Sequence, residues 1–190
     1  HRESNNLYKK LEEETGQPTG FHECGSLRIA YKKEDLDWFK YVKGILDNIG
    51  APSEIFSTNE IRKVHPFIKL DGTLGAFYTP DDGHTDPTST TNAMAKGARN
   101  FGAKIYRKNR VTDIKRLPSG EWKLITEKGN IICEHVVNAA GSYGPEVGAM
   151  VGLKNIPSIN MIHHYLVTEE HASIAKLGKE LPVVRDPQAS

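Results

Sequence analysis

The spacing of apolar and polar residues predicts both helices and strands. The clearest helix spans residues 34–49, where six apolar side chains recur at the three- to four-residue spacing of one helix face before Gly50. Within residues 21–31, by contrast, Leu27, Ile29 and Tyr31 alternate with other residues, which is typical of a half-buried strand. Both periods occur within the first fifty residues, so the chain is neither all-helical nor all-β.

Local start signals indicate where three further helices begin. Ser57 and Glu60 have the spacing of a capping box, in which each residue satisfies a backbone N–H of the other. Asp86 is a suitable N-cap, and Pro87 suits the first helical position of the helix that follows. A first helix should be capped at residue 4 or 5 and end near Gly16.

The remaining alternating segments predict short strands separated by turns rich in glycine. The predicted strands are residues 74–79, 103–107, 111–116, 121–126, 130–137 and 158–167, and a short helix is expected at 169–177. Helices mixed with short strands and one buried strand-to-helix unit favour an α/β (or α+β) fold with two interleaved lobes.

The segment 133–141 is the most informative motif. Its two valines suit the interior of a strand, and the small residues Ala139, Ala140 and Gly141 leave the backbone open where the strand ends. A helix starting near Pro145 would complete a strand, turn and helix N-terminus, which favours an anionic or dinucleotide ligand. An ordinary tight turn would have the same sequence, so both interpretations stay open.

The motif that usually accompanies such a strand, Gly-x-Gly-x-x-Gly after a first strand, is missing from the sequence. The first residue is also not a methionine. We therefore expect an internal piece of a dinucleotide-dependent enzyme, with part of the chemistry outside it.

Composition excludes several classes of protein. Hydrophobic residues make up 37% and charged residues 26%, with 25 basic and 24 acidic side chains. There is no basic excess to indicate nucleic acid, no apolar run long enough for a membrane and no signal peptide. Two distant cysteines, Cys24 and Cys133, do not make a disulfide framework and suggest a reducing compartment such as the cytoplasm.

No metal site is expected from the sequence. His22 and Cys24 would share one face of a strand, but two ligands are too few for zinc. The polar run from Asp81 through His84 to Asp86 is explained by a turn followed by a helix N-cap.

Six segments, in order along nearly the whole chain, resemble one family. They are Glu13–His22, Gly25–Ala30, Tyr78–Pro87, Val136–Gly141, His163–Thr168 and Leu181–Asp186. The family is that of the flavin-dependent dimethylglycine and sarcosine dehydrogenases, within the wider D-amino-acid-oxidase-like and glycine-oxidase-like flavoproteins.

This resemblance implies an FAD/NAD(P)-binding-type α/β domain fragment interleaved with an antiparallel-sheet substrate domain. Residues 1–19 would lead from the cofactor domain, 20–83 and 153–190 would belong to the substrate domain, and 84–152 would belong to the FAD-binding domain.

The resemblance also implies an activity, with FAD as cofactor. Family members oxidise the C–N bond of a small amino-acid substrate, here dimethylglycine or sarcosine, and the imine product is hydrolysed or passed to folate bound by a further C-terminal domain. Two alternatives stay open: a non-catalytic partner protein like the regulatory subunit of pyruvate dehydrogenase phosphatase, and a truncated domain without activity. A mitochondrial matrix location would replace the cytoplasm in a eukaryote.

On the family pattern, His163 is the catalytic candidate and faces the flavin and the substrate. Its neighbour His164 stands where the family has glutamine. Tyr165 shares the face of His163 and either lines the substrate site or belongs to the core. Arg28 could bind a substrate carboxylate bidentately, although a surface role is equally compatible with its strand.

Four positions are candidates for holding FAD. Val111 matches the family position whose backbone touches the adenine side of the cofactor. Ala139, Ala140 and Gly141 match the small-residue end of the later cofactor strand, where the missing side-chain bulk lets a ligand approach.

Overall fold

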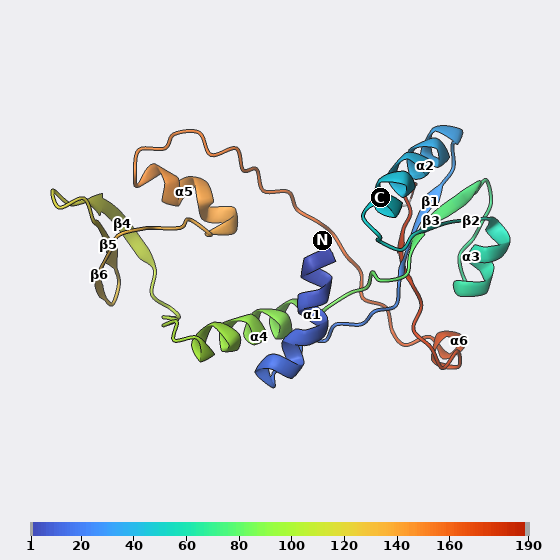
Figure 1. Cartoon of the computed structure of the whole chain (residues 1–190), viewed down its shortest axis with the longest axis horizontal. Coiled ribbons are helices and arrows are strands. Elements are labelled where there is room, and N and C mark those ends of the chain that lie inside the picture. The colour runs from blue at the N-terminus through green and yellow to red at the C-terminus, as the bar shows by residue number, and fades with distance from the viewer. Residues whose placement is uncertain (1, 189–190) are drawn as a thin grey trace. The chain divides into compact units, whose positions relative to one another are not determined.

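The computed structural model describes residues 2–188, which form two compact units (Figure 1). The larger unit contains the chain up to Lys104 together with the residues from Glu170 onward, and the smaller unit is Ile105–Glu169. None of the helices within residues 2–188 combines the length and apolar character needed to cross a membrane.

A four-stranded sheet organises the larger unit. Its strands, in spatial order, are β2 (Glu54–Phe56), β3 (Gly75–Thr79), β1 (Ser26–Ala30) and β7 (Val183–Arg185). β1 pairs antiparallel with β3 and parallel with β7. The predicted alternation in β1 is confirmed, because Leu27 and Ile29 are each only 1% exposed whereas Arg28 between them is exposed.

Two helices cover the two faces of this sheet. α2 (Lys33–Asn48) buries Phe39 against Phe77, with ring centroids 5.5 Å apart. α3 (Thr58–Val64) places the fully buried Ile61 among Leu27 and Ile29 on the other face. Both helices match their predicted positions. Each apolar stripe is buried by a different face of one sheet, which explains why the sequence contains two separate helical patterns.

The predicted capping box of α3 is present. The Ser57 side chain accepts a hydrogen bond from the Glu60 backbone N–H, and the Glu60 carboxylate accepts one from the Ser57 backbone N–H at 2.7 Å. The Ser57 hydroxyl also donates to the Glu60 carboxylate at 2.7 Å, and this bond, together with that from the Ser57 backbone N–H, holds the pKa of Glu60 below its ordinary value. The backbone N–H groups of Ser57 and Glu60 at the start of this short helix are therefore hydrogen-bonded by side chains of the capping box.

Two further helices of the larger unit, α1 (Arg2–Thr15) and α4 (Pro87–Asn100), pack against each other. The predicted cap of α4 is confirmed, because the Asp86 carboxylate accepts a hydrogen bond from the Ser89 backbone N–H at 2.6 Å. The predicted start of α1 is wrong, since the helix already begins at Arg2. Asn5 does not cap the helix and instead donates a hydrogen bond to the Asp81 carbonyl oxygen.

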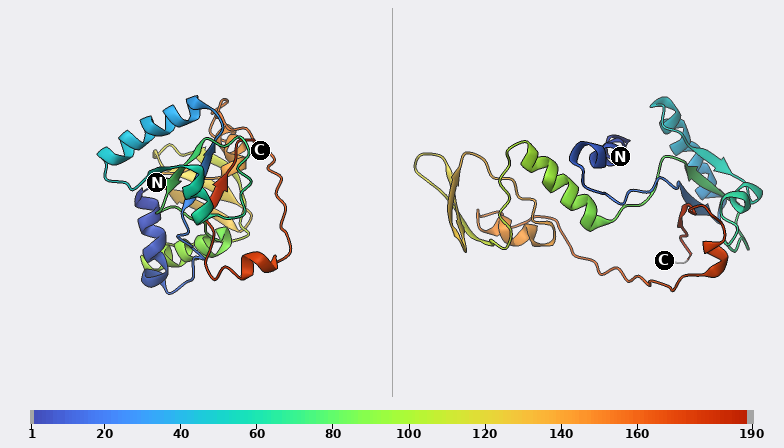
Figure 2. Two further views of the ribbon diagram at one scale, coloured as in Figure 1. Left: turned by 90° about the vertical axis from the view of Figure 1, so that its right-hand side faces the viewer. Right: turned by 90° about the horizontal axis from the view of Figure 1, so that it is seen from below.

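The smaller unit contains an antiparallel sheet in the order β4–β5–β6, the last part of which is shorter than predicted. Its elements are β4 (Val111–Arg116), β5 (Trp122–Thr126), β6 (Gly129–Cys133), the 3₁₀ turn η1 (Gly141–Tyr143) and α5 (Gly144–Ala149). Figure 2 shows the three strands as a ribbon of successive hairpins. Ile114 is the buried centre of this sheet at 5% exposure.

Several predicted strands do not form. Residues 103–107, 134–137 and 158–167 belong to no sheet of the described chain, and Val137 is 87% exposed. A strand is stable only when its backbone N–H and C=O groups pair with a neighbour, and residues 2–188 provide no such neighbour for these segments. The predicted helix at 169–177 is reduced to α6 (Ala172–Ala175).

Ile61→Ala is expected to lower the free energy of unfolding by about 2–5 kcal/mol, because it empties the centre of the packed face beneath β1 and β3. Urea denaturation followed by circular dichroism measures this loss. Ile45→Ala, at a half-exposed position of α2, is the matched control and should cost far less. Equal losses in the two variants would contradict the packing described for Ile61.

Acidification should destabilise the protein partly through His65. Burial holds the pKa of His65 below its ordinary value of 6.5, and within residues 2–188 its buried Nδ1 has no hydrogen-bond partner. The unfolded chain therefore binds a proton that the folded chain resists, so stability falls as the pH drops through the unfolded pKa.

The urea concentration at the midpoint of unfolding should consequently be lower at about pH 5.5 than at about pH 7.5. His65→Gln should reduce the difference between these two midpoints. His135→Gln, at an exposed position, serves as the control and should leave the difference unchanged. A pH dependence identical in wild type and His65→Gln would exclude His65 as a contributor.

Candidate cofactor and substrate sites

A hollow in the smaller unit brings together two of the predicted cofactor residues. It has a volume of about 400 Å³, and Val111 and Ala140 both line it. Val111 begins β4, and Ala140 directly precedes η1. The other lining residues are Arg110, Tyr143, Glu146, Val147 and Met150. The strand start and the small-residue turn thus share one mostly apolar concavity.

Asn138 shapes the small-residue turn. Its amide donates a hydrogen bond to the Gly144 carbonyl oxygen at 2.9 Å, and its side-chain oxygen accepts one from the Ala140 backbone N–H at 3.2 Å. Sequence reasoning passed over this residue, although an asparagine that bonds to its own backbone two residues on is a known turn signal. The side chain thereby links residue 140 to the start of α5, just after the point where the strand was expected to end.

Gly141 adopts a left-handed backbone conformation with φ of +54°, which favours glycine. A Cβ atom placed there would meet nothing within 4 Å. The backbone at this position is therefore uncovered, which satisfies the geometric condition for close approach by a ligand. Ala139 is exposed beside it.

The helix after this turn is shorter than the sequence suggested. α5 contains only six residues and follows a 3₁₀ turn, so it cannot provide the ordered N-terminal N–H groups expected from the motif. The positive charge near the hollow comes from Arg110, whose guanidinium lies 3.9 Å from the Glu146 carboxylate with both side chains mostly exposed. Such a long, exposed pair contributes little, so Arg110 can turn to an anionic group.

Arg28 lies in a second hollow, of about 340 Å³, on the larger unit. Its side chain extends from β1 over the ring of Phe39, with 6.0 Å between the guanidinium carbon and the ring centroid. Ser26, Thr79 and Asp82 also line this hollow. Arg28 is therefore placed on the α2 face of the sheet, opposite the face that holds Leu27 and Ile29.

Arg185 is a further candidate for the site, and sequence reasoning missed it. It is the direct neighbour of Arg28 across the parallel pair of β1 and β7, and it lines the same hollow. Within the described chain neither guanidinium makes an ion pair, and like charges in directly opposed positions destabilise a sheet. The register that joins them depends on residues far apart in sequence, so no local signal could have found the pair.

His163 and Tyr165 lie in a stretch without regular secondary structure, residues 153–170. Tyr165 is 89% exposed, and neither residue lines the hollow of Val111 and Ala140. Their assignment to the substrate site stays a prediction.

Comparison with known proteins covers the whole chain. The family model described as FAD dependent oxidoreductase, the DAO family, matches residues 1–189. Dimethylglycine dehydrogenase of Rattus norvegicus is 40% identical over 190 residues, which is 100% of this chain and 22% of the relative. Sarcosine dehydrogenase of Homo sapiens is 34% identical over 190 residues, covering 96% of this chain and 20% of the relative. Both relatives are described as mitochondrial.

Two further matches differ in kind. The pyruvate dehydrogenase phosphatase regulatory subunit of Mus musculus is 33% identical over 170 residues, covering 87% of this chain and 19% of that protein. The crystal structure of L-proline dehydrogenase from P. horikoshii superposes with a TM-score of 0.80 at 26% identity, covering 98% of this chain and 49% of the other. The chain thus spans about a fifth of the length of the curated relatives it matches.

The structure and the matches agree on fold and family. The mixed α/β architecture expected from the sequence is confirmed, and its structural neighbours include amino-acid oxidoreductases. The family is FAD-dependent, in agreement with the expected cofactor. The chain belongs to the DAO family of FAD-dependent oxidoreductases.

Proposed function

We propose that this chain is part of an enzyme that oxidatively demethylates a small N-methylated amino acid, dimethylglycine or sarcosine. The observation that carries the proposal is the similarity to dimethylglycine dehydrogenase along the entire chain, with weaker similarity to sarcosine dehydrogenase. The whole enzyme's activity is an inference, because the chain spans only a fifth of those relatives.

FAD, when bound, supplies the two-electron acceptor for oxidation of the substrate C–N bond. In this proposal the backbone of Val111 contacts the adenine side of the cofactor. Ala139, Ala140 and Gly141 allow close approach, because they carry little or no side chain and Gly141 is uncovered. Arg110 can offer its guanidinium to an anionic part of the ligand.

Arg28 and Arg185 are proposed to bind the substrate carboxylate. A carboxylate between two guanidiniums would remove their mutual repulsion and accept charge-assisted hydrogen bonds from both. The stacking of Arg28 on Phe39 leaves the polar edge of its guanidinium available. This arrangement selects substrates that carry an anionic group and leaves the amine free to be oriented elsewhere.

His163 is proposed to accept the proton that the substrate ammonium must lose before its C–N bond can be oxidised. Tyr165, two positions along an extended segment, would line the same side. Both roles require residues 158–167 to acquire a pairing partner, since the segment is exposed and unpaired within the described chain.

The domain assignment is also part of the proposal. Residues 20–83 and 153–190 would contribute to the substrate domain and residues 84–152 to the cofactor domain, with residues 1–19 leading from the latter. The imine product would be hydrolysed or passed to folate bound by a further C-terminal domain. We place the protein in the cytoplasm, or in the mitochondrial matrix if the source is a eukaryote.

A second candidate function is that of a non-catalytic partner protein. The similarity to the pyruvate dehydrogenase phosphatase regulatory subunit favours it, because that match covers most of this chain. A truncated domain without activity is the remaining alternative. Neither alternative requires FAD to be reduced by a substrate, and this separates both from the enzyme.

The purified protein, with any residues its reading frame adds at either end, should show a flavin absorption spectrum. Under anaerobic conditions that spectrum should bleach when dimethylglycine or sarcosine is added, since electrons then leave the substrate for FAD. Glycine betaine, which has no N–H or lone pair on nitrogen, is the control and should leave the spectrum unchanged. A protein that stays colourless with added FAD would contradict the oxidoreductase proposal and favour the partner-protein function.

Arg28→Gln is expected to raise the KM for the substrate by about 10- to 100-fold with a smaller effect on kcat, because about 1.5–3 kcal/mol of charge-assisted bonding is lost. Steady-state kinetics on the flavin-loaded protein measures both parameters. Arg62→Gln, on α3, removes an arginine from the same unit and should change neither. An unchanged KM in Arg28→Gln would remove Arg28 from the substrate site.

A further inference from the structure

Outside the proposed cofactor and substrate sites, four side chains able to bind a metal gather beside the sheet of the larger unit. They come from three separate parts of the chain: the approach to β1, the turn after β3, and the approach to β7. The residues are His22, Cys24, His84 and Glu180. The sequence predicted no metal at His22, Cys24 or His84, and the proposed oxidation does not use this cluster.

Backbone pairing places the two histidines on one side. His22 and His84 exchange both backbone N–H···O=C hydrogen bonds, at 2.8 and 3.1 Å, in an isolated antiparallel bridge. Residues directly opposite each other in such a pair project to the same side. The rings accordingly stack, with centroids 5.0 Å apart and an interplanar angle of 16°.

Cys24 and Glu180 join the histidines through the same pairing. Cys24 is two residues beyond His22, and its sulfur lies within 4.8 Å of a ring nitrogen of His84. The Val183 backbone N–H donates to the Gly25 carbonyl oxygen at 2.9 Å, which brings the segment before β7 alongside. Glu180 then meets His22, with 2.6 Å between its Oε1 and the imidazole Nδ1.

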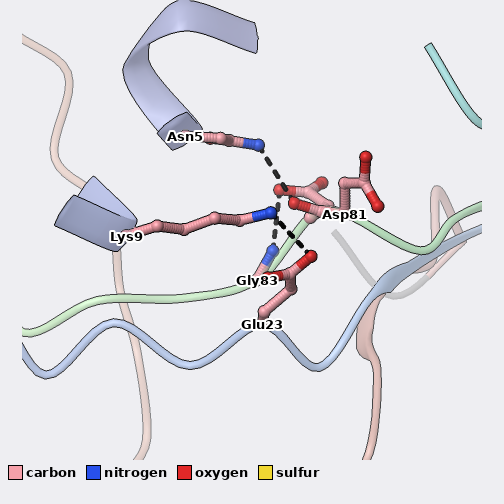
Figure 3. A network of polar contacts seen from close by, with 6 residues as sticks. Asn5, Lys9, Glu23, Asp81 and Gly83 are labelled. Atoms are coloured by element: carbon pink, nitrogen blue, oxygen red, sulfur yellow. Dashed lines mark hydrogen bonds and ion pairs between the residues drawn. The ribbon is translucent and has the colours of Figure 1, made fainter. Parts of the chain in front are cut away.

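Figure 3 shows that Asn5 and Lys9 of α1 bond to the two segments that precede β1 and follow β3. Asn5 of α1 donates to the Asp81 carbonyl oxygen at 3.1 Å, and Lys9 pairs with Glu23 at 2.8 Å. The Gly83 backbone N–H donates to the Asp82 carboxylate at 2.9 Å. Two short segments without regular structure are thereby anchored to a helix, which limits their movement.

Gly83 makes the close approach of these segments possible. A Cβ atom at this position would overlap the carbonyl oxygen of His22, so only glycine allows the bridge that aligns the two histidines. The Asp-Gly-His sequence before α4 is therefore more than a turn followed by a cap. It is required for the position of His84.

The spacing of the donor atoms suits a single ion. The sulfur of Cys24, a ring nitrogen of His84 and a carboxylate oxygen of Glu180 all lie within 4.8 Å of one another. Donor atoms around a tetrahedral zinc ion are about 3.5 Å apart. His84 and Glu180 are exposed and Cys24 is half-buried, so small rotations of the two exposed side chains would close the difference.

The surrounding charge also favours a cation. The carboxylates of Glu180 and Asp82 both act electrostatically on the Cys24 sulfur. No lysine or arginine pairs with Glu180 within residues 2–188, and its ion-pair partner there is the imidazole of His22. A divalent ion would compensate this negative environment.

We propose that Cys24, His84 and Glu180 bind one borderline-soft divalent cation of the zinc class. His22 orients the Glu180 carboxylate by its hydrogen bond, and water completes the coordination. One thiolate, one imidazole and one carboxylate match the donors that zinc accepts, and they are unsuited to calcium or magnesium, which prefer oxygen ligands alone. The ion would tie the start of β1, the turn after β3 and the approach to β7 together.

Cobalt(II) titration of the metal-free full chain tests this proposal, since cobalt replaces zinc in such sites and is coloured. The protein is first treated with a chelator, and difference spectra are recorded so that any flavin absorption cancels. We expect a thiolate-to-cobalt charge-transfer band that saturates at one equivalent and disappears on addition of zinc. The band should be absent in Cys24→Ser and retained in Cys133→Ser, the matched control.

Glu180→Gln and His84→Ala provide the second set of variants. Each should weaken zinc binding by at least about tenfold in competition with a chromophoric chelator, which is the lower end of what even outer ligand partners contribute. His135→Ala, at an exposed position of the smaller unit, should leave zinc binding unchanged. Circular dichroism of every variant verifies that it is folded.

A wild-type protein without the band, or a band that survives in folded Cys24→Ser, would overturn the proposal. The measurement involves neither the flavin nor an amino-acid substrate. Its outcome is therefore independent of whether the protein is the proposed oxidoreductase.

Discussion

The hydrogen-bond ladders on the two sides of β1 determine which side chains meet in the larger unit. The antiparallel ladder to β3 and the parallel ladder to β7 set one register for residues that are far apart in sequence. One face of β1 then buries Leu27 and Ile29, while the other presents Arg28 beside Arg185. A shift of one residue in either ladder would exchange the buried and exposed faces.

The same hydrogen-bond ladders also position the residues of the proposed cation site. The pairing extends beyond the regular strands, through the bridge of His22 and His84 and the hydrogen bond from Val183 to Gly25. This additional pairing assembles the proposed cation site next to the N-terminal ends of β1 and β7. The packed face beneath Ile61 stabilises the ladders, and the ladders position the polar groups. Gly83 lacks the side chain that would overlap the His22 carbonyl oxygen, and this allows the two segments to approach.

In the smaller unit, a missing side chain likewise makes a close approach to the backbone possible. Asn138 ties the small-residue turn to the start of α5, and Gly141 leaves its backbone uncovered next to the hollow shared by Val111 and Ala140. The proposed cofactor contacts are therefore backbone contacts. Such contacts leave little trace in the residue types, which is why Val111 could be suggested only through the family resemblance.

The sequence by itself determined the elements whose causes are local: the helix of residues 33–48, the capping box of Ser57, the N-cap of Asp86 and the alternation around Ile29. These depend on neighbours within a few positions along the chain. The predicted strand at 158–167 failed because a strand needs a partner that sequence periodicity cannot supply. Only the tertiary structure decided which distant residues meet, since the register of β1, β3 and β7 arises from pairing between separated segments.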